Sequence, residues 1–170
     1  DATSTYSYSG TGGAVGASGY NTETSTIHSG AGTNTASDPY NAGDTLAIGT
    51  NATVSEQSNE TVAIGKDSSA EKNTHYSTVI GQGAQAREGA SDSTVIGHGA
   101  SSAARESVVI GRTANVARTN SVRSTAMGWG AQVSNAYDAV ALGAGSQTSV
   151  NGGVALGAGA VASRDTSDLK

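Results

Sequence analysis

Histidines and carboxylates are the side chains of this chain that could carry acid–base or metal chemistry. The three histidines, His28, His75 and His98, are separated in sequence and fall at different positions of the repeat described below. Asp and Glu are scattered, and no Asp recurs in the glycine turns as it does in calcium-binding nonapeptide rolls. With no cysteine, thiolate metal sites are excluded. We therefore predict no catalytic site, no metal and no cofactor, with the histidines exposed to solvent.

A group of polar and basic side chains on the second half of the chain could instead bind a partner. Between residues 101 and 135 four arginines accompany one acid, Glu106, and the single tryptophan stands nearby. Such a surface could hold an acidic or Pro-rich partner through charge-assisted and cation–π contacts. A solvated rim that keeps the molecule soluble is the alternative interpretation. The candidate residues are Gln85, Arg87, Ser101, Arg105, Arg112, Asn115, Arg118, Arg123, Trp129 and Gln132.

Tyrosines near the N-terminus form a second candidate surface. Four of the six lie in the first 40 residues, among Ser, Gly, Asn and Thr. Tyr combined with Ser and Gly is the composition of adaptable recognition surfaces. Aromatic rings that cap the end of the fold are the competing interpretation. The four residues are Tyr6, Tyr8, Tyr20 and Tyr40.

Composition restricts how such residues can be positioned. The 170 residues include no Phe and one Trp, only 35% are apolar, and 24 are Gly, so an aromatic-rich globular core is excluded. A net charge of −5 argues against a nucleic-acid partner, which would require a basic surface. No apolar run approaches the roughly 18 residues of a membrane span, so we expect no direct membrane insertion by this chain. A regular fold that buries small side chains is required instead.

Eight nonamers recur between residues 45 and 162, with glycines spaced 14 to 17 residues apart. Positions below are counted from this glycine. The residue at −1 is large and aliphatic, the residue at −2 is Ala or Val, and the residue at −3 is Leu, Val or Thr. The register survives the inserted residues, which must therefore lie in loops. The repeat glycines are Gly49, Gly65, Gly81, Gly97, Gly111, Gly128, Gly143 and Gly157.

These columns predict two short strands in each repeat. The strand before the glycine is apolar on both faces, so it must be covered on both sides. We place the aliphatic column, with Ile80 as its third-repeat member, inside the roll and the Ala or Val column toward a neighbouring subunit. Position +4 is polar in seven of eight repeats, which predicts a second strand with one wet face. The glycine and position +2, where only Thr113 disfavours positive φ, predict a tight corner between the strands.

The motif [VLT]-[AV]-[ILM]-G-x-x-[AS]-x-[AVST] closely resembles the head repeat of trimeric autotransporter adhesins, the YadA-like heads of Gram-negative outer membranes. The resemblance covers residues 45–162 and implies an all-β, left-handed parallel β-roll (solenoid), assembled as a homotrimer about one axis. It also implies a cell-surface location and attachment to host extracellular matrix, host receptors, other cells or solid surfaces. Five of the seven spacings exceed the 14 residues common in that family.

The two ends of the chain depart from the repeat. Residues 1–44 lack the aliphatic signature, and we interpret them as degenerate capping coils at the distal tip, since an open solenoid end invites edge pairing. Residues 163–170 drop the pattern and are interpreted as the start of a connection to a neck and stalk that are absent here.

Three other interpretations compete with a binding module. Hexapeptide acyltransferases are left-handed β-helices with a catalytic histidine, but their period is six residues. An ice-binding solenoid needs one threonine ladder, whereas position +1 varies from Lys66 to Trp129 to Ala158. A purely structural spacer or fibre module remains the alternative to the non-enzymatic adhesin head that we predict.

Overall fold

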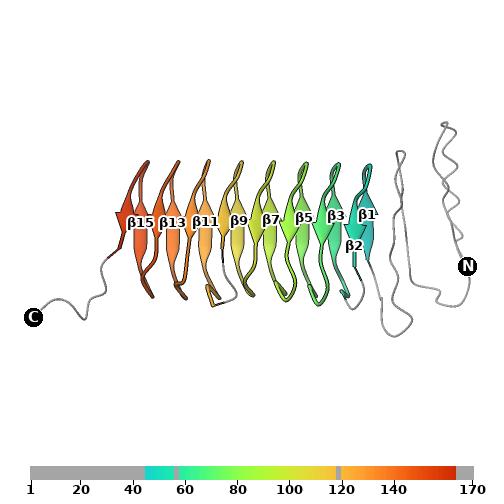
Figure 1. The fold of residues 1–170 in the computed structure, drawn as a ribbon, viewed down its shortest axis with the longest axis horizontal. Helices are drawn as coiled ribbons and strands as arrows, with labels where there is room; N and C mark the ends of the chain where they lie inside the picture. Colours follow the sequence, from blue (N-terminus) through green and yellow to red (C-terminus); the bar gives the residue numbers. More distant parts are fainter. Residues whose placement is uncertain (1–44, 56–57, 118–119, 164–170) are drawn as a thin grey trace, which may run out of the picture.

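The computed structural model describes residues 45–55, 58–117 and 120–163. Within these ranges the chain forms sixteen short strands and no helix, stacked as consecutive coils of a rod (Figure 1). The predicted capping coils 1–44, with Tyr6, Tyr8, Tyr20 and Tyr40, lie outside the described residues. So do His28, Arg118 and the predicted connection from residue 164 onward.

Each repeat supplies one three-residue strand before its glycine and one two-residue strand after it. The first strands are β1 Leu46–Ile48, β3 Val62–Ile64, β5 Thr78–Ile80, β7 Thr94–Ile96, β9 Val108–Ile110, β11 Thr125–Met127, β13 Val140–Leu142 and β15 Val154–Leu156. The second strands are β2 Thr53–Val54, β4 Ser69–Ala70, β6 Gln85–Ala86, β8 Ser101–Ser102, β10 Asn115–Val116, β12 Gln132–Val133, β14 Gln147–Thr148 and β16 Val161–Ala162.

The two kinds of strand build two parallel sheets. All odd-numbered strands form one eight-stranded sheet, and all even-numbered strands form the other. Pairing follows the repeat columns, so that Ile80 is the cross-strand partner of both Ile64 and Ile96. Each column is therefore a ladder of side chains about 4.8 Å apart along the rod. The predicted all-β parallel solenoid is confirmed.

Glycines at the corner between the strands are required by both backbone conformation and space. The repeat glycines have φ values from 113° to 137°, a region that L residues rarely adopt. A Cβ added to Gly81 would lie 2.5 Å from the carbonyl oxygen of Gly97 in the next coil. Position +2 also has positive φ throughout, and Thr113 adopts it as well, with φ 56°. The predicted corner is confirmed. Thr113 adopts the same positive φ as the glycines at this position, although this conformation is unfavourable for a β-branched residue.

The interior of the coil holds only small side chains, which corrects one of the sequence predictions. Val79 is completely buried, whereas its neighbour Ile80 points outward and is only partly buried. The prediction that Ile80 lies inside the roll and that the Ala or Val column faces another subunit is wrong. A tight turn, closed by the Ala84 N–H donating to the Gly81 carbonyl at 3.2 Å, brings the two sheets close together. Ala, Val, Ser and Thr fit that narrow space, and Ile does not.

Buried Ser and Thr hydroxyls at position −4 form hydrogen bonds between successive coils. The Ser93 hydroxyl donates to the Ala104 carbonyl at 3.0 Å and accepts the backbone N–H of Ser107, one coil further on, at 3.3 Å. The same arrangement is present at Thr61, at Ser77 and at Ser124, which accepts the N–H of Ala139 at 3.2 Å. Each hydroxyl thus satisfies buried backbone groups that would otherwise lack a partner. Beyond Ser124 the column continues as Ala139 and Gly153, and the hydroxyl ladder ends.

Candidate functional site

An uncharged polar ladder covers the outer face of the even-numbered sheet. Gln85, Ser101, Asn115 and Gln132, all at position +4, are direct cross-strand neighbours in β6, β8, β10 and β12. Arg87 lies beside this ladder, and its Nε donates to the Ser101 hydroxyl at 3.1 Å. Five of the predicted candidate residues therefore share one surface, and the wet face expected of the second strand is confirmed.

Two further candidates meet at the glycine corner. Arg112 and Trp129 both occupy position +1 in consecutive coils, and the N–H of Gly130 donates to the Arg112 carbonyl at 2.9 Å. The Trp129 side chain is 61% exposed, so the indole stands free at the edge of the rod. Next along the corner are Ala144 and Ala158, which leave the space beside the indole open.

The last two described candidates lie at the opposite edge, where the longer loops join one coil to the next. Arg123 forms a two-pronged ion pair with Asp138, with Nε and Nη2 at 2.6 and 2.9 Å from the carboxylate oxygens. Arg105 lies 4.0 Å from both Asp92 and Glu106. Asp92 and Asp138 come from outside the window 101–135, so the basic flank is more balanced than the local sequence indicates.

The Arg123–Asp138 contact also changes proton affinity. The hydrogen bond from Arg123 lowers the pKa of the Asp138 carboxyl below its ordinary value of 3.8, and burial opposes this effect. The same hydrogen bond raises the pKa of Arg123. Both groups are therefore fixed in their charged forms at neutral pH.

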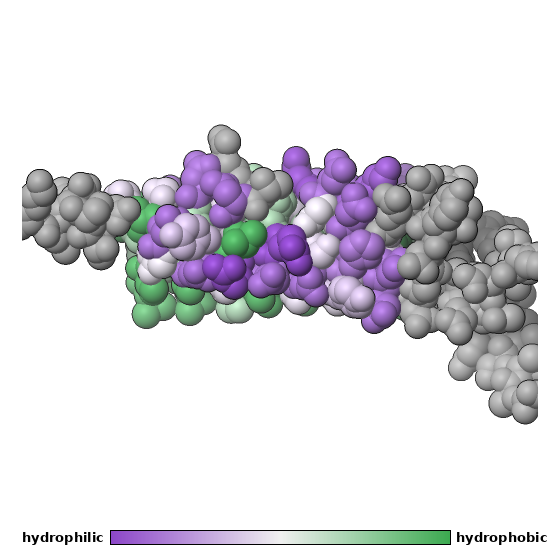
Figure 2. All heavy atoms as spheres, turned by 90° about the horizontal axis from the view of Figure 1, so that it is seen from below, coloured by the Kyte–Doolittle hydropathy of each residue, from purple (hydrophilic) through white to green (hydrophobic). Residues whose placement is uncertain are grey.

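The described candidates thus fall on three separate parts of the rod rather than on one patch. The amide ladder runs along a sheet face, while the Arg112–Trp129 corner and the Arg105–Arg123 loops lie at opposite edges of the coil. Figure 2 looks onto the loop edge, where hydrophilic side chains dominate most of the length. A hydrophobic band follows one side of that view and is most prominent near the C-terminal end.

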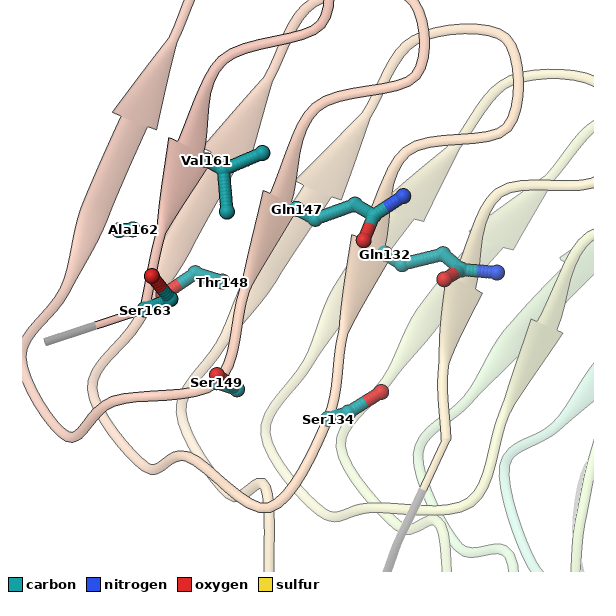
Figure 3. Close-up of a pocket in the computed structure, with 8 residues that line it drawn as sticks. All are labelled: Gln132, Ser134, Gln147, Thr148, Ser149, Val161, Ala162 and Ser163. Atoms are coloured by element: carbon teal, nitrogen blue, oxygen red, sulfur yellow. The ribbon is translucent and has the colours of Figure 1, made fainter.

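A shallow hollow at the C-terminal end of the polar sheet was missed by the sequence analysis. It has a volume of about 180 Å³ and spans β12, β14 and β16 (Figure 3). Its position depends on how three coils stack, which one repeat cannot reveal. A sequence signal nevertheless exists, because residues 124–163 contain one charged side chain, Asp138. Its lining includes Gln132, Ser134, Gln147, Ser149, Val161 and Ser163.

The outer face of the odd-numbered sheet is a continuous aliphatic surface. Positions −3 and −1 of every coil point away from the interior, and the in-register pairing aligns them along the rod. Exposure increases toward the C-terminal end, where Val154 is 62% and Leu156 69% exposed. This surface, which we call the aliphatic face, comprises Leu46, Ile48, Val62, Ile64, Ile80, Ile96, Val108, Ile110, Met127, Val140, Leu142, Val154 and Leu156 together with the threonines at −3.

The described histidines are not placed together. His75 lies in a loop, where its Nδ1 accepts the backbone N–H of Asn59 at 3.3 Å, and His98 stands at a glycine corner. Within the described ranges no three His, Asp or Glu side chains are arranged to hold a metal ion. The same residues include no helix with the length and hydrophobicity needed to cross a membrane.

The comparison with protein families agrees with the strand pattern. The family described as YadA head domain repeat (2 copies) matches residues 41–68, 120–146 and 134–160. These three segments are similar to the YadA head repeat. The coils between these matches pair in the same parallel register as the matched ones, so the repeat architecture is continuous across β3 to β11. None of the curated proteins compared with the chain matches it.

YadA head repeats are the repeats of trimeric autotransporter adhesin heads, which are surface-exposed binding modules rather than a kind of enzyme. The fold described above is a regular scaffold of two parallel sheets with side-chain ladders on its outside. The outward side-chain ladders are therefore the candidate functional groups of the described residues.

Proposed function

We propose that this chain is the head of a trimeric adhesin on the surface of a Gram-negative bacterium. Three copies would pack their aliphatic faces together and present their polar sheets outward. The head would attach to host matrix proteins, receptors, other cells or solid surfaces through many weak, non-covalent contacts.

The aliphatic face is the observation that carries the assembly. Large aliphatic side chains at −1 stand outside every coil and form an unbroken surface along eight strands. Contiguous apolar surfaces of this kind are rare on soluble monomers and mark interaction sites. The opposite sheet carries Gln, Asn, Ser or Thr at the equivalent outward position in seven of eight coils, with Val161 the exception, so only one of the two sheets favours burial by another chain along its length.

The polar sheets supply the attachment surface. Parallel in-register strands hold the outward side chains in place before any partner arrives, so little ordering entropy is lost on contact. Three copies of each ladder in one head, and many heads on one cell, can convert weak contacts into firm attachment. This is a passive mechanism that needs no catalytic group.

The assembly is tested by the mass of the particle in solution. Light scattering should give three times the 16.6 kDa chain mass. Ile80→Asp places a carboxylate on the aliphatic face and should shift the particle toward single chains. Gln85→Asp, which places the same charge on the polar sheet, is the matched control and should remain trimeric. A wild-type particle with the mass of one chain would refute the trimer.

Adhesion is tested with beads that carry the trimer. Beads should be retained by at least one surface in a panel of matrix proteins, epithelial cells and glass, and Ile80→Asp beads should be retained less because multivalency is lost. If the trimer forms but no surface retains it, the chain is a structural spacer and the adhesin proposal fails.

A further inference from the structure

Charged side chains are distributed unevenly along the rod, and the C-terminal coils contain almost none. Residues 45–123 carry fourteen Asp, Glu, Lys and Arg side chains, whereas residues 124–163 carry only Asp138. That single carboxylate is already paired with Arg123 through two hydrogen bonds. The last coils therefore present a surface without a free charge, although charged side chains are what normally keeps an exposed surface soluble.

The hollow over β12, β14 and β16 lies within this region. Gln132 and Gln147 are direct cross-strand neighbours on its wall, and both are exposed. Figure 3 shows their carboxamides side by side, extending away from the strands, with Ser134 and Ser149 along the loop side of the hollow. Among the described residues neither carboxamide makes a hydrogen bond. Each can therefore offer two N–H donors and a carbonyl acceptor to a ligand.

Apolar contact area accompanies these polar groups. Val161 lines the hollow and is 64% exposed. Trp129 stands at the glycine corner of the coil that supplies Gln132, three residues earlier in the chain, and is also largely exposed. The indole does not line the hollow, so Val161 and Ala162 supply the apolar surface beside the carboxamide donors and acceptors.

We propose that this hollow binds an uncharged glycan, with one sugar ring seated between Gln132 and Gln147. A pyranose displays hydroxyls that both donate and accept hydrogen bonds, which carboxamides and serine hydroxyls match. Its C–H faces can pack on Val161. The hollow's volume of about 180 Å³ has the size of one such ring. Among the described residues no Lys, Arg or His side chain lines the hollow, so an anionic ligand has no charge partner in this lining. The site deepens the proposed function, and rests on it for access to glycans at a cell surface.

The test uses the full 170-residue chain on an array of uncharged and anionic oligosaccharides, followed by saturation-transfer NMR with each uncharged glycan that is retained. We expect saturable binding of at least one uncharged glycan. Gln147→Ala should weaken that binding about tenfold, since each lost pair of hydrogen bonds is worth about 1.4 kcal/mol. Gln82→Ala removes an exposed carboxamide at a glycine corner outside the hollow and should leave the affinity unchanged.

Two outcomes would overturn the glycan site. One is that no uncharged glycan binds while heparin-derived, anionic oligosaccharides do, which would move the contact to the Arg112 corner. The other is that Gln147→Ala and Gln82→Ala change the glycan affinity equally. If beads bearing Gln147→Ala still adhere as wild type does, the adhesin proposal stands and only the glycan site fails. If no beads adhere but the glycan binds in solution, the glycan site stands and the adhesin proposal fails.

Discussion

The first and last coils of the rod have the same backbone conformation and strand pairing but differ in most of their side chains. In the earlier coils, hydroxyls at −4 accept backbone N–H groups of the next coil at Thr61, Ser77, Ser93 and Ser124, and charged residues line both edges. In β13 to β16 the −4 residues are Ala139 and Gly153, the corner carries Ala144 and Ala158, and aliphatic side chains are exposed.

This contrast separates what the fold requires from what it permits. Both regions keep the glycine corner and a small residue at −2, such as Val79 early and Ala141 late, each fully buried. The hydroxyl ladder and the charges are dispensable for the coil itself. The surface of the last coils is therefore free to serve contact, either with other chains or with a ligand.

The interior column is common to both regions, and breaking it should have the largest effect. Val79→Asp would bury an unpaired carboxylate and cost several kcal/mol of unfolding free energy, enough to abolish cooperative melting. Circular dichroism during heating measures this loss. Gln85→Asp is the control on the wet face and should melt like the parent. A Val79→Asp protein that also melts like the parent would contradict the interior assignment.

The glycine corner should distinguish the middle of the rod from its end. Gly81→Ala and Gly157→Ala share the unfavourable positive φ, which costs about 1–3 kcal/mol. Only Gly81 faces a carbonyl oxygen at 2.5 Å from the new Cβ, whereas nothing lies within 4 Å at Gly157. We expect denaturant melts to show the larger loss for Gly81→Ala. Equal losses would mean that φ alone, and not coil stacking, selects glycine.

The end of the hydroxyl ladder predicts a small stabilising change. The buried Thr148 hydroxyl has no hydrogen-bond partner, and the opposite residue, Gly153, offers no side chain. Thr148→Val should raise the free energy of unfolding by about 1 kcal/mol, because an unsatisfied buried hydroxyl is removed and Val already occupies this column at Val133. Ser107→Val, which breaks a bonded hydroxyl in the earlier coils, should destabilise. Denaturant melts that rank the two variants the other way would refute the explanation.

The Arg123–Asp138 ion pair connects the earlier coils to the last coils, and we expect it to make the stability of the fold depend on pH. Because the pKa of Asp138 is lowered in the folded chain, its stabilising contribution is present above its ordinary value of 3.8 and is lost as the pH falls through the lower folded pKa. Arg123→Gln should raise that pKa toward the ordinary value, measured by NMR titration of the carboxyl carbon. Arg112→Gln, at the other edge, should not. An unchanged Asp138 titration in Arg123→Gln would show that the pair does not persist in solution.

Much of this architecture could be predicted because it repeats. Eight copies of one pattern reveal strands, corner and register, since a column that keeps its character through insertions must stack on itself. The surface sites do not repeat. Arg105 finds Asp92 from a neighbouring coil, and the hollow combines side chains of three coils, so neither follows from a local window.

Sequence patterns alone were enough to predict a stacked two-strand coil with glycine corners and a polar second strand, because backbone conformation and side-chain alternation are local properties. They could not decide which face of the Ile-containing strand points inward, since Ile80 and Val79 are both apolar. The direction follows from how the two sheets pack, because the space between them admits Val79 and leaves Ile80 on the outer surface.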